Sequence, residues 1–190
     1  MSQPSSPSPA LIFFSVLYRR TEVELAEIEN ILAQEFSPQI GQLSQYFNAH
    51  CPMKRYYSKE MGPEAELDRV FYFSLRPVSR ELLVTAKLQA FRLEEKWLRT
   101  SGDTTYRVVN LDVGIVTLEN LVLATGKMFT HRLYLGQGVC ADLTLIYQND
   151  AFHTLPWTYP DYGHLEIRNF FAWLRKMLHL KILQGLQASS

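Results

Sequence analysis

Apolar residues fall along the chain in runs whose spacing predicts strands alternating with helices. Residues 10–18 are almost continuously aliphatic or aromatic, which predicts a central strand buried on both faces. Thr21 and Glu24 form a T-x-x-E capping box, and Ser37-Pro38 is a stop signal, so a helix is expected between them. Its buried stripe, read from helical spacing, is Leu25, Ile28, Leu32 and Phe36.

The following segments continue this alternation. Strands are expected at 41–48, 69–75 and 106–111. A helix between the last two is opened by Pro77 and Ser79 and ended by Ser101-Gly102-Asp103. Its buried stripe is Leu83, Ala86, Ala90, Leu93 and Trp97. The resulting order, β-α-β-β-α-β, is that of the split βαβ motif, so the sequence predicts an α+β fold with a ferredoxin-like core.

The last third of the chain adds strands and one more helix. Three strands are expected, at 121–125, 131–135 and 139–148, and Gly136-Gln137-Gly138 joins the last two in a β-hairpin. An irregular segment, LPWTYPDYG, leads into a final helix. The apolar stripe of that helix is Ile167, Phe171, Leu174, Leu178 and Ile182, with Met177 on the same side. The predicted core therefore carries a C-terminal β-hairpin and a packing helix.

Two segments lack any clear period. Residues 1–9 are rich in Ser and Pro, without the apolar region of a signal peptide, and are expected to be a disordered tail before a single domain at 10–190. Residues 49–68 form a long segment that contains CPMKRYYSKEMGPE. Long loops inside compact domains are either functional or disordered, and the tyrosines together with Met61 favour function.

Charge and cysteine content narrow the classes of partner. The 190 residues include 19 Lys and Arg and 19 Asp and Glu, so the formal net charge is zero. A neutral chain lacks the basic excess expected for binding duplex nucleic acid or an anionic membrane surface. Cys51 and Cys140 are far apart and outside any C-x-x-C motif, which favours reduced thiols and a cytoplasmic protein.

Arg107, Asn110 and Asp112 are the first group of candidate site residues. Strand alternation places Asn110 and Asp112 on one face and Arg107 on the other. In one interpretation the two residues end a strand and face a ligand or metal. In the other, Asp112 caps a turn beside Gly114. The sequence leaves both open.

Lys127, His131 and Arg132 form a second group, because three donors within one short segment suit a phosphate or carboxylate. The alternative is a solvated loop with an arginine ion pair. A hairpin-like return would bring this group beside Arg107 and Asp112. Tyr57 and Glu60 are expected to approach from the long segment, although a lone loop carboxylate such as Glu60 is more typically solvated.

Other chemistry is weakly supported by the sequence. No metal-motif spacing, no G-x-S-x-G motif and no cofactor signature is present. Asp161 is expected to cap the final helix near Gly163, with Trp157 and Tyr159 packing the irregular segment onto the core.

Four stretches together resemble the bacterial family named domain of unknown function 4416. They are YYSKEMG at 56–62, RVVNLDVG at 107–114, LVLATGKMFTHRLYL at 121–135 and LPWTYPDY at 155–162. The resemblance covers nearly the whole chain after the tail. This chain has Asp112-Val113-Gly114 where relatives tend to have Asp-Pro-Gly. Some members are described as GTP-binding, but this sequence has no G-x-x-x-x-G-K-[ST] motif.

Three functions are consistent with these observations. The first is binding of a small anionic ligand, such as a nucleotide or a phosphorylated metabolite, in a pocket with the long segment as a wall. The second is a non-catalytic interaction or scaffold protein, whose charges form closed ion pairs and which exposes an apolar patch elsewhere. The third, binding of single-stranded RNA, would use Phe71 and Phe73, for which a place in the core is the stronger expectation.

Overall fold

The computed structural model describes residues 3, 5–47 and 52–188. The strands are β1 (Leu11–Arg19), β2 (Leu43–Phe47), β3 (Leu67–Ser74), β4 (Leu98–Ser101), β5 (Thr104–Arg107), β6 (Val109–Val116), β7 (Asn120–Thr125), β8 (Arg132–Gly136), β9 (Val139–Gln148) and β10 (Ala151–Thr154). The helices are α1 (Leu25–Ile40), α2 (Lys54–Met61), α3 (Leu82–Lys96), α4 (Pro160–Gly163) and α5 (Leu165–Ala188), with a short 3-10 helix, η1 (Glu64–Glu66). The fold is α+β, as the sequence predicted.

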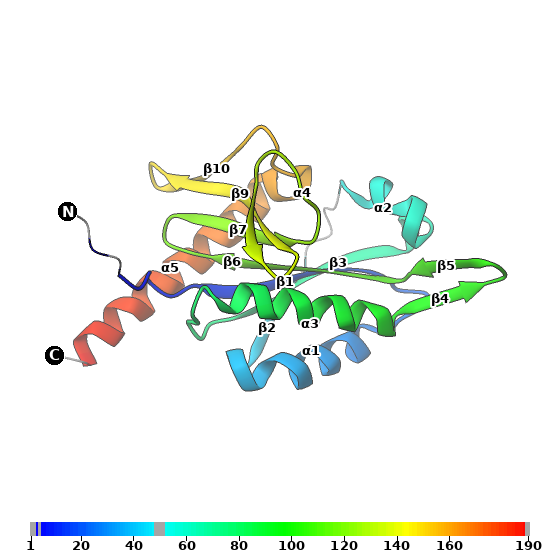
Figure 1. The fold of residues 1–190 in the computed structure, drawn as a ribbon, viewed down its shortest axis with the longest axis horizontal. Coiled ribbons are helices and arrows are strands. Elements are labelled where there is room, and N and C mark those ends of the chain that lie inside the picture. The colour runs from blue at the N-terminus through cyan, green and yellow to red at the C-terminus, as the bar shows by residue number, and fades with distance from the viewer. Residues whose placement is uncertain (1–2, 4, 48–51, 189–190) are drawn as a thin grey trace.

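Eight strands form one antiparallel sheet, and β4 pairs with β5 in a separate ribbon that extends from the body (Figure 1). The order across the sheet is β10-β9-β7-β6-β1-β3-β2, with β8 paired to β9. Strand β1 therefore lies between β6 and β3, and all of its residues except Arg19 are buried. This confirms the central strand that the apolar run at 10–18 predicted.

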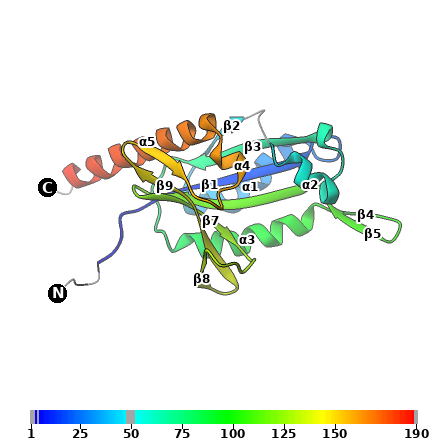
Figure 2. The same ribbon diagram turned by 90° about the horizontal axis from the view of Figure 1, so that it is seen from above.

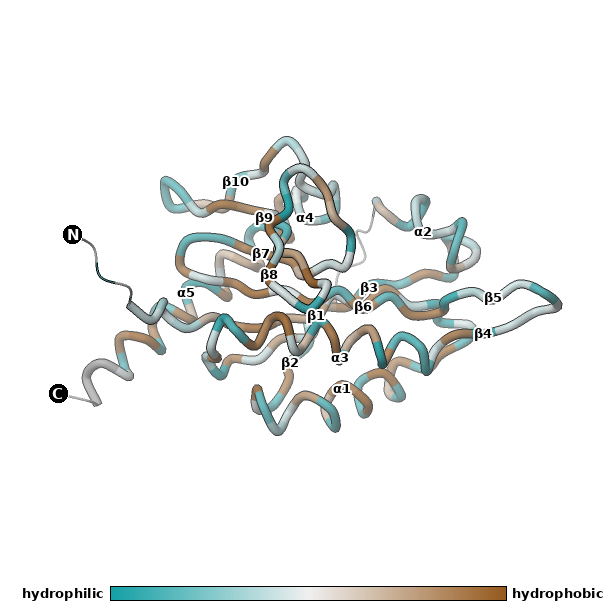
Figure 3. Tube along the Cα trace, in the orientation of Figure 1, coloured by the Kyte–Doolittle hydropathy of each residue, from teal (hydrophilic) through white to brown (hydrophobic). Residues whose placement is uncertain are grey.

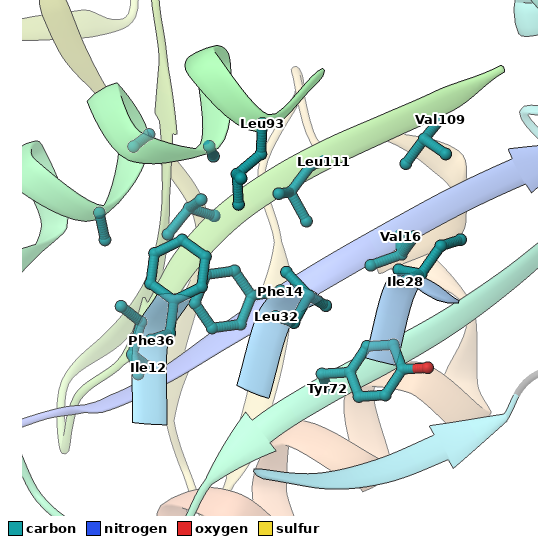
Figure 4. Close-up of a cluster of buried hydrophobic side chains, with 14 of the residues drawn as sticks. Ile12, Phe14, Val16, Ile28, Leu32, Phe36, Tyr72, Leu93, Val109 and Leu111 are labelled. Atoms are coloured by element: carbon teal, nitrogen blue, oxygen red, sulfur yellow. The ribbon is translucent and has the colours of Figure 1, made fainter. Parts of the chain in front are cut away.

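Helices cover both faces of the sheet. Helices α1 and α3 lie on one face, and α5, α4 and α2 lie on the other (Figure 1). On the first face, Phe14 of β1 packs on Phe36 of α1 with ring centroids 4.4 Å apart, within a core that the predicted stripes of α1 and α3 complete (Figure 4). Burying side chains of this size is the main source of stability in the fold.

The second face has an apolar end and a polar end. At the apolar end, Phe13 and Phe71 contact Phe171 of α5, with ring centroids 4.8 and 5.7 Å apart. Phe71 and Phe73 are buried there, as expected, and neither ring is available to stack on a base. Further along, the same face carries polar side chains. Ser15 of β1 lies opposite Asp112 of β6 on one side and opposite Phe71 of β3 on the other, so the polar end begins at this position. Along the chain, hydrophobic and hydrophilic residues alternate in helices α1 and α3, and the strands of the sheet contain hydrophobic stretches (Figure 3).

The structure corrects the predicted limits of α1. Thr21 and Glu24 make no capping box, because α1 begins at Leu25 with Glu24 itself at the N-cap and without a side-chain cap. The Thr21 hydroxyl donates to Glu66 Oε2 at 2.8 Å. Pro38 does not stop the helix, which continues to Ile40. Proline there removes only one hydrogen bond, in the last turn, and Gly41 with φ of 79° ends the helix instead.

Two further boundaries were predicted wrongly. Helix α3 ends at Lys96, and the segment that was assigned to its end forms the β4–β5 hairpin around Gly102, whose φ is 58°. Asp112-Val113-Gly114 is no turn, since it lies within β6 opposite β1 and β7. The predicted hairpin turn at Gly136-Gln137-Gly138 is confirmed, with positive φ at all three residues. Strand β10 was not predicted.

Candidate functional site

The polar end of the sheet contains a fork between β6 and β7. The two strands pair only from Val113 opposite Ala124 to Val116 opposite Leu121. Before Val113, the start of β6 pairs with no described strand on that side, because β7 ends at Thr125. Side chains of α3 take the place of the missing strand. Lys87 Nζ donates to the carbonyl of Leu111 at 2.9 Å, and the Leu111 amide donates to Glu94 Oε1 at 2.7 Å.

Lys87 and Glu94 place two ionisable groups at this fork. Lys87 is 4% exposed, with Nζ 4.4 Å from the centroid of the Phe91 ring, and it makes no ion pair within the described part of the chain. Burial raises the pKa of the Glu94 carboxyl, while Lys87 and the Leu111 amide act in the opposite direction. A buried ammonium and a carboxyl of raised pKa in one cleft are typical of a functional site.

A cleft with two connected chambers opens at the fork. The outer chamber, of about 180 Å³, has Lys87, Phe91 and Glu94 of α3 on one side and Tyr57 and Glu60 of α2 on the other. The inner chamber, of about 60 Å³, reaches under α4 to the sheet. Both chambers are lined by Tyr57, Asp112, Ala124, Thr125 and Tyr159.

An ion pair beneath α4 holds the inner chamber together. Arg69 Nη2 of β3 lies 2.8 Å from Asp161 Oδ2, and both side chains are 3% exposed. The other oxygen, Asp161 Oδ1, accepts the backbone N–H of Met53 at 2.9 Å, just before α2. Asp161 therefore joins β3, α2 and α4 and does not cap the final helix as the sequence suggested. Tyr57 of α2 and Tyr162 of α4, on two of the elements that it joins, both line the chamber.

Asp112 lies where the two chambers meet. Its carboxylate accepts the Asn110 amide, Nδ2 to Oδ2 at 3.0 Å, and it makes no ion pair with any described residue. Both residues lie within β6 on one face, as alternation predicted, and neither is at a strand end. Burial raises the pKa of the Tyr57 phenol far above its usual value, and the charge of Asp112 adds to this effect. Tyr57 is therefore a neutral hydroxyl beside a carboxylate at neutral pH.

Arg132 and His131 contact the cleft through Asp142. Arg132 Nε lies 2.8 Å from Asp142 Oδ2, and His131 Nε2 lies 3.3 Å from the same oxygen. Arg132 Nη2 also donates to the Tyr159 hydroxyl at 2.8 Å. The hydroxyl oxygen is the acceptor in this hydrogen bond, so its own proton does not point towards Arg132. The His131 ring stacks on Trp157, with centroids 4.8 Å apart. These contacts fix the tyrosine and the carboxylate that line the chambers.

The structure brings most of the predicted site residues together. Tyr57, Glu60, Arg107, Asn110, Asp112 and Lys127 all line the outer chamber. His131 and Arg132 lie behind the wall, in contact with Asp142 and Tyr159. Arg107 is paired with Glu60 at 2.7 Å and lies 3.8 Å from Glu94, so its charge is already compensated. Among the predicted cations in the described residues, Lys127 makes no ion pair.

Sequence reasoning missed Lys87, Glu94, Arg69 and Asp142. Three of them had a signal, since a charged residue beside an apolar helical stripe or within an aromatic strand must have a partner when buried. Lys87 follows Ala86 in the predicted stripe, Glu94 follows Leu93, and Arg69 alternates with Phe71. The role of Asp142 depends on the pairing of β8 with β9, which places it opposite Arg132.

Comparison with known proteins identifies the family of the chain. The family model described as "Domain of unknown function (DUF4416)" matches residues 8–178. The chain belongs to this family. The matched range of this DUF4416 chain includes all residues that line the two chambers. Neither a curated protein nor a solved structure matches the chain.

Two further properties bear on the function of this DUF4416 protein. Among residues 3, 5–47 and 52–188, no three His, Cys, Asp or Glu side chains are placed to ligate one metal ion. In the same part of the chain, no helix is both long and apolar enough to cross a membrane.

Proposed function

We propose that this protein binds a small anionic ligand in the cleft at the β6–β7 fork. The observation that carries the proposal is the buried Lys87 ammonium, which lines the outer chamber without an ion pair in the described chain. One of its three N–H donors is used by Leu111, and Phe91 covers another side. A buried cation is costly without an anion, and a ligand phosphate or carboxylate would supply one.

Lys127 supports the same ligand from the rim. It is exposed, lines the outer chamber and follows Gly126, where an added Cβ would lie 3.1 Å from the Phe91 ring. The Gly126 backbone therefore lies close to the Phe91 ring at the edge of the outer chamber. Phosphorylated metabolites and nucleotides, or carboxylates of similar size, suit a chamber that two lysines line.

The proposal is tested by thermal denaturation of the protein with inorganic phosphate, pyrophosphate, nucleotides, sugar phosphates and short carboxylates. A ligand at a hundredfold excess over its Kd stabilises by about 2.7 kcal/mol, which shifts the Tm measurably. The Lys87→Met and Lys127→Ala variants should lose this shift, and Lys176→Ala, an exposed lysine of α5, should keep it. If no anion shifts the wild-type Tm, or if both variants keep the shift, the proposal is wrong.

A second candidate function is an interaction protein, which one observation favours specifically. The loop before β8 and β8 itself expose large apolar side chains on a hairpin that projects from the body (Figure 2). They are Met128, Phe129, Leu133, Tyr134 and Leu135, with exposed fractions between 44% and 74%. Exposed apolar groups of this density are typical of contact surfaces. Size-exclusion chromatography with light scattering on Leu133→Glu and wild type tests for self-association through this hairpin.

The fold and the compartment have finer assignments that we also propose. Strands β6-β1-β3-β2 with helices α1 and α3 are consistent with the order of a ferredoxin-like split βαβ unit, extended by β7 to β10 and α5. A cytoplasmic location is supported by the free thiol of Cys140. Cys51 lies outside the described residues.

A further inference from the structure

We propose that the ligand of this cleft is a zwitterion, whose ammonium group enters the inner chamber while its phosphate or carboxylate stays at Lys87 and Lys127. The inference rests on the proposed function and specifies the ligand class for the same site. It follows from three features of the inner chamber: its charge, a buried hydroxyl without a partner, and its aromatic walls.

The charges of the two chambers differ in sign. Asp112, Asp142 and Asp161 line the inner chamber, and Arg69 is the cationic side chain among the described residues of that lining. Arg69 pairs with Asp161, and Arg132 pairs with Asp142 from behind the wall. Asp112 accepts an amide hydrogen bond from Asn110 and makes no ion pair with any described residue. The inner chamber thus favours a cation, whereas three cations and three carboxylates line the outer one.

A buried hydroxyl provides an independent indication of a ligand. Tyr162 is 2% exposed and lines the inner chamber, and its hydroxyl has no hydrogen-bond partner among the described residues. The nearby Ser15 hydroxyl lowers the pKa of the Tyr162 phenol. The two hydroxyls do not, however, meet the geometry of a hydrogen bond. Burial raises the pKa of Tyr162 strongly, so the phenol remains neutral. An ammonium N–H would satisfy its oxygen, and buried polar groups without partners are rare.

Aromatic rings complete the chamber. Tyr57, Tyr159 and Tyr162 all line it, one from α2 and two from the α4 region. Aromatic faces with a carboxylate among them attract a desolvated organic cation. A metal ion would need several carboxylates around one point, and no described group of three is placed for that. The small volume, about 60 Å³, suits a primary ammonium group better than a larger base.

Matched pairs of ligands test the inference. Calorimetric titration or thermal shift compares 2-aminoethyl phosphate with ethyl phosphate, and β-alanine with propionate and N-acetyl-β-alanine. The amine-bearing member should bind about tenfold more tightly than its amine-free or acetylated partner. A series of linear ω-amino acids then shows which length spans the distance from the inner chamber to the lysines.

Variants separate the two ends of the ligand. Asp112→Asn should abolish the preference for the amine and leave the affinity for ethyl phosphate nearly unchanged, while Lys127→Ala should weaken both members of a pair. Glu64→Gln, an exposed carboxylate on η1 outside the cleft, is the matched control and should change neither. Tyr162→Phe removes only the buried hydroxyl, so it decides the matter if circular dichroism shows that Asp112→Asn is unfolded.

The outcomes distinguish this inference from the proposed function. If ethyl phosphate or propionate binds but the amine adds nothing, the zwitterion is wrong and the anion site stands. The same conclusion follows if the folded Asp112→Asn and Tyr162→Phe variants both keep the full amine preference. If no probe of either kind binds, the proposed function and this inference are both wrong.

Discussion

Arg69 and Asp161 form an ion pair, Nη2 to Oδ2 at 2.8 Å, that is almost completely buried. Arg69 belongs to β3 and Asp161 to α4, so the pair joins segments separated by about half of the chain. The same carboxylate accepts the Met53 amide before α2. The Asp161 side chain therefore joins α4 to β3 and to the start of α2, and all three elements line the inner chamber.

We predict that Asp161→Ala destabilises the protein by about 3–5 kcal/mol, because it leaves a buried guanidinium without this carboxylate. Urea denaturation of wild type and variant measures the loss. The control is Glu119→Gln, which breaks the pair of Arg80 with Glu119, whose side chains are 25% and 58% exposed. That exposed pair should be worth less than about 1 kcal/mol. Equal losses in the two variants would contradict the role assigned to Asp161.

Gly114 should tolerate no side chain. A Cβ there would lie 2.6 Å from Phe13 Cε1 and 2.9 Å from the Val122 carbonyl oxygen, both inside a packed sheet. We expect Gly114→Ala to cost about 1–3 kcal/mol or more of unfolding free energy, by the usual cost of overpacking. Gly185→Ala is the comparison, since a Cβ there meets nothing within 4 Å on α5, and it should be neutral or stabilising. A Gly114→Ala variant as stable as wild type would show that β1 and β6 are not this close.

Glu94 should make stability depend on pH in a defined direction. Burial raises its pKa in the folded protein above the ordinary value of 4.5, so the folded state binds the proton more tightly than the unfolded state does. The contribution of Glu94 to stability is therefore greatest at acid pH and falls as pH rises from the unfolded pKa through the folded one. Glu94→Gln keeps an acceptor for the Leu111 amide without the charge.

The measurement for Glu94 is the free energy of unfolding of wild type and Glu94→Gln across mildly acidic to neutral pH. The advantage of the variant should grow as pH rises. Glu64→Gln, at an exposed position, should show no such trend. An advantage that shrinks with rising pH would mean that the nearby positive charges of Lys87 and Arg107 outweigh the burial of Glu94.

Thiol reactivity should report the packing around β9. Cys140 is fully buried, with Sγ 3.1 Å from Met128 Sδ, so it should not react with a thiol reagent in the native protein. After unfolding under non-reducing conditions, we expect both cysteines of the chain to react. Comparison with Cys140→Ser assigns the slow thiol. The absence of any reactive thiol after unfolding would contradict the expected reducing compartment.

Local patterns predicted the elements well where burial is one-sided or complete. The stripes of α1, α3 and α5 and the central strand β1 follow from apolar spacing, because a helix or strand can bury only the residues on the face it presents. Ends were harder to predict. Thr21 had the chemistry of a cap, yet α1 begins only at Leu25, and the Thr21 hydroxyl donates to Glu66, which is distant in sequence.

The sequence by itself determined which polar residues could belong to a site. Asp112 follows an apolar strand, Lys127 lies in a short cluster of donors, and Tyr57 lies in a long segment without a period. Only the tertiary structure decided which of them remain uncompensated. Arg107 and Arg132 looked as available as Lys127, but folding places Glu60 and Asp142 against them. Lys87 lines the cleft because β7 separates from β6 there, which leaves the Leu111 carbonyl of β6 to accept a hydrogen bond from Lys87. Ion pairing depends on distances across the sheet, and a linear pattern contains no such distances.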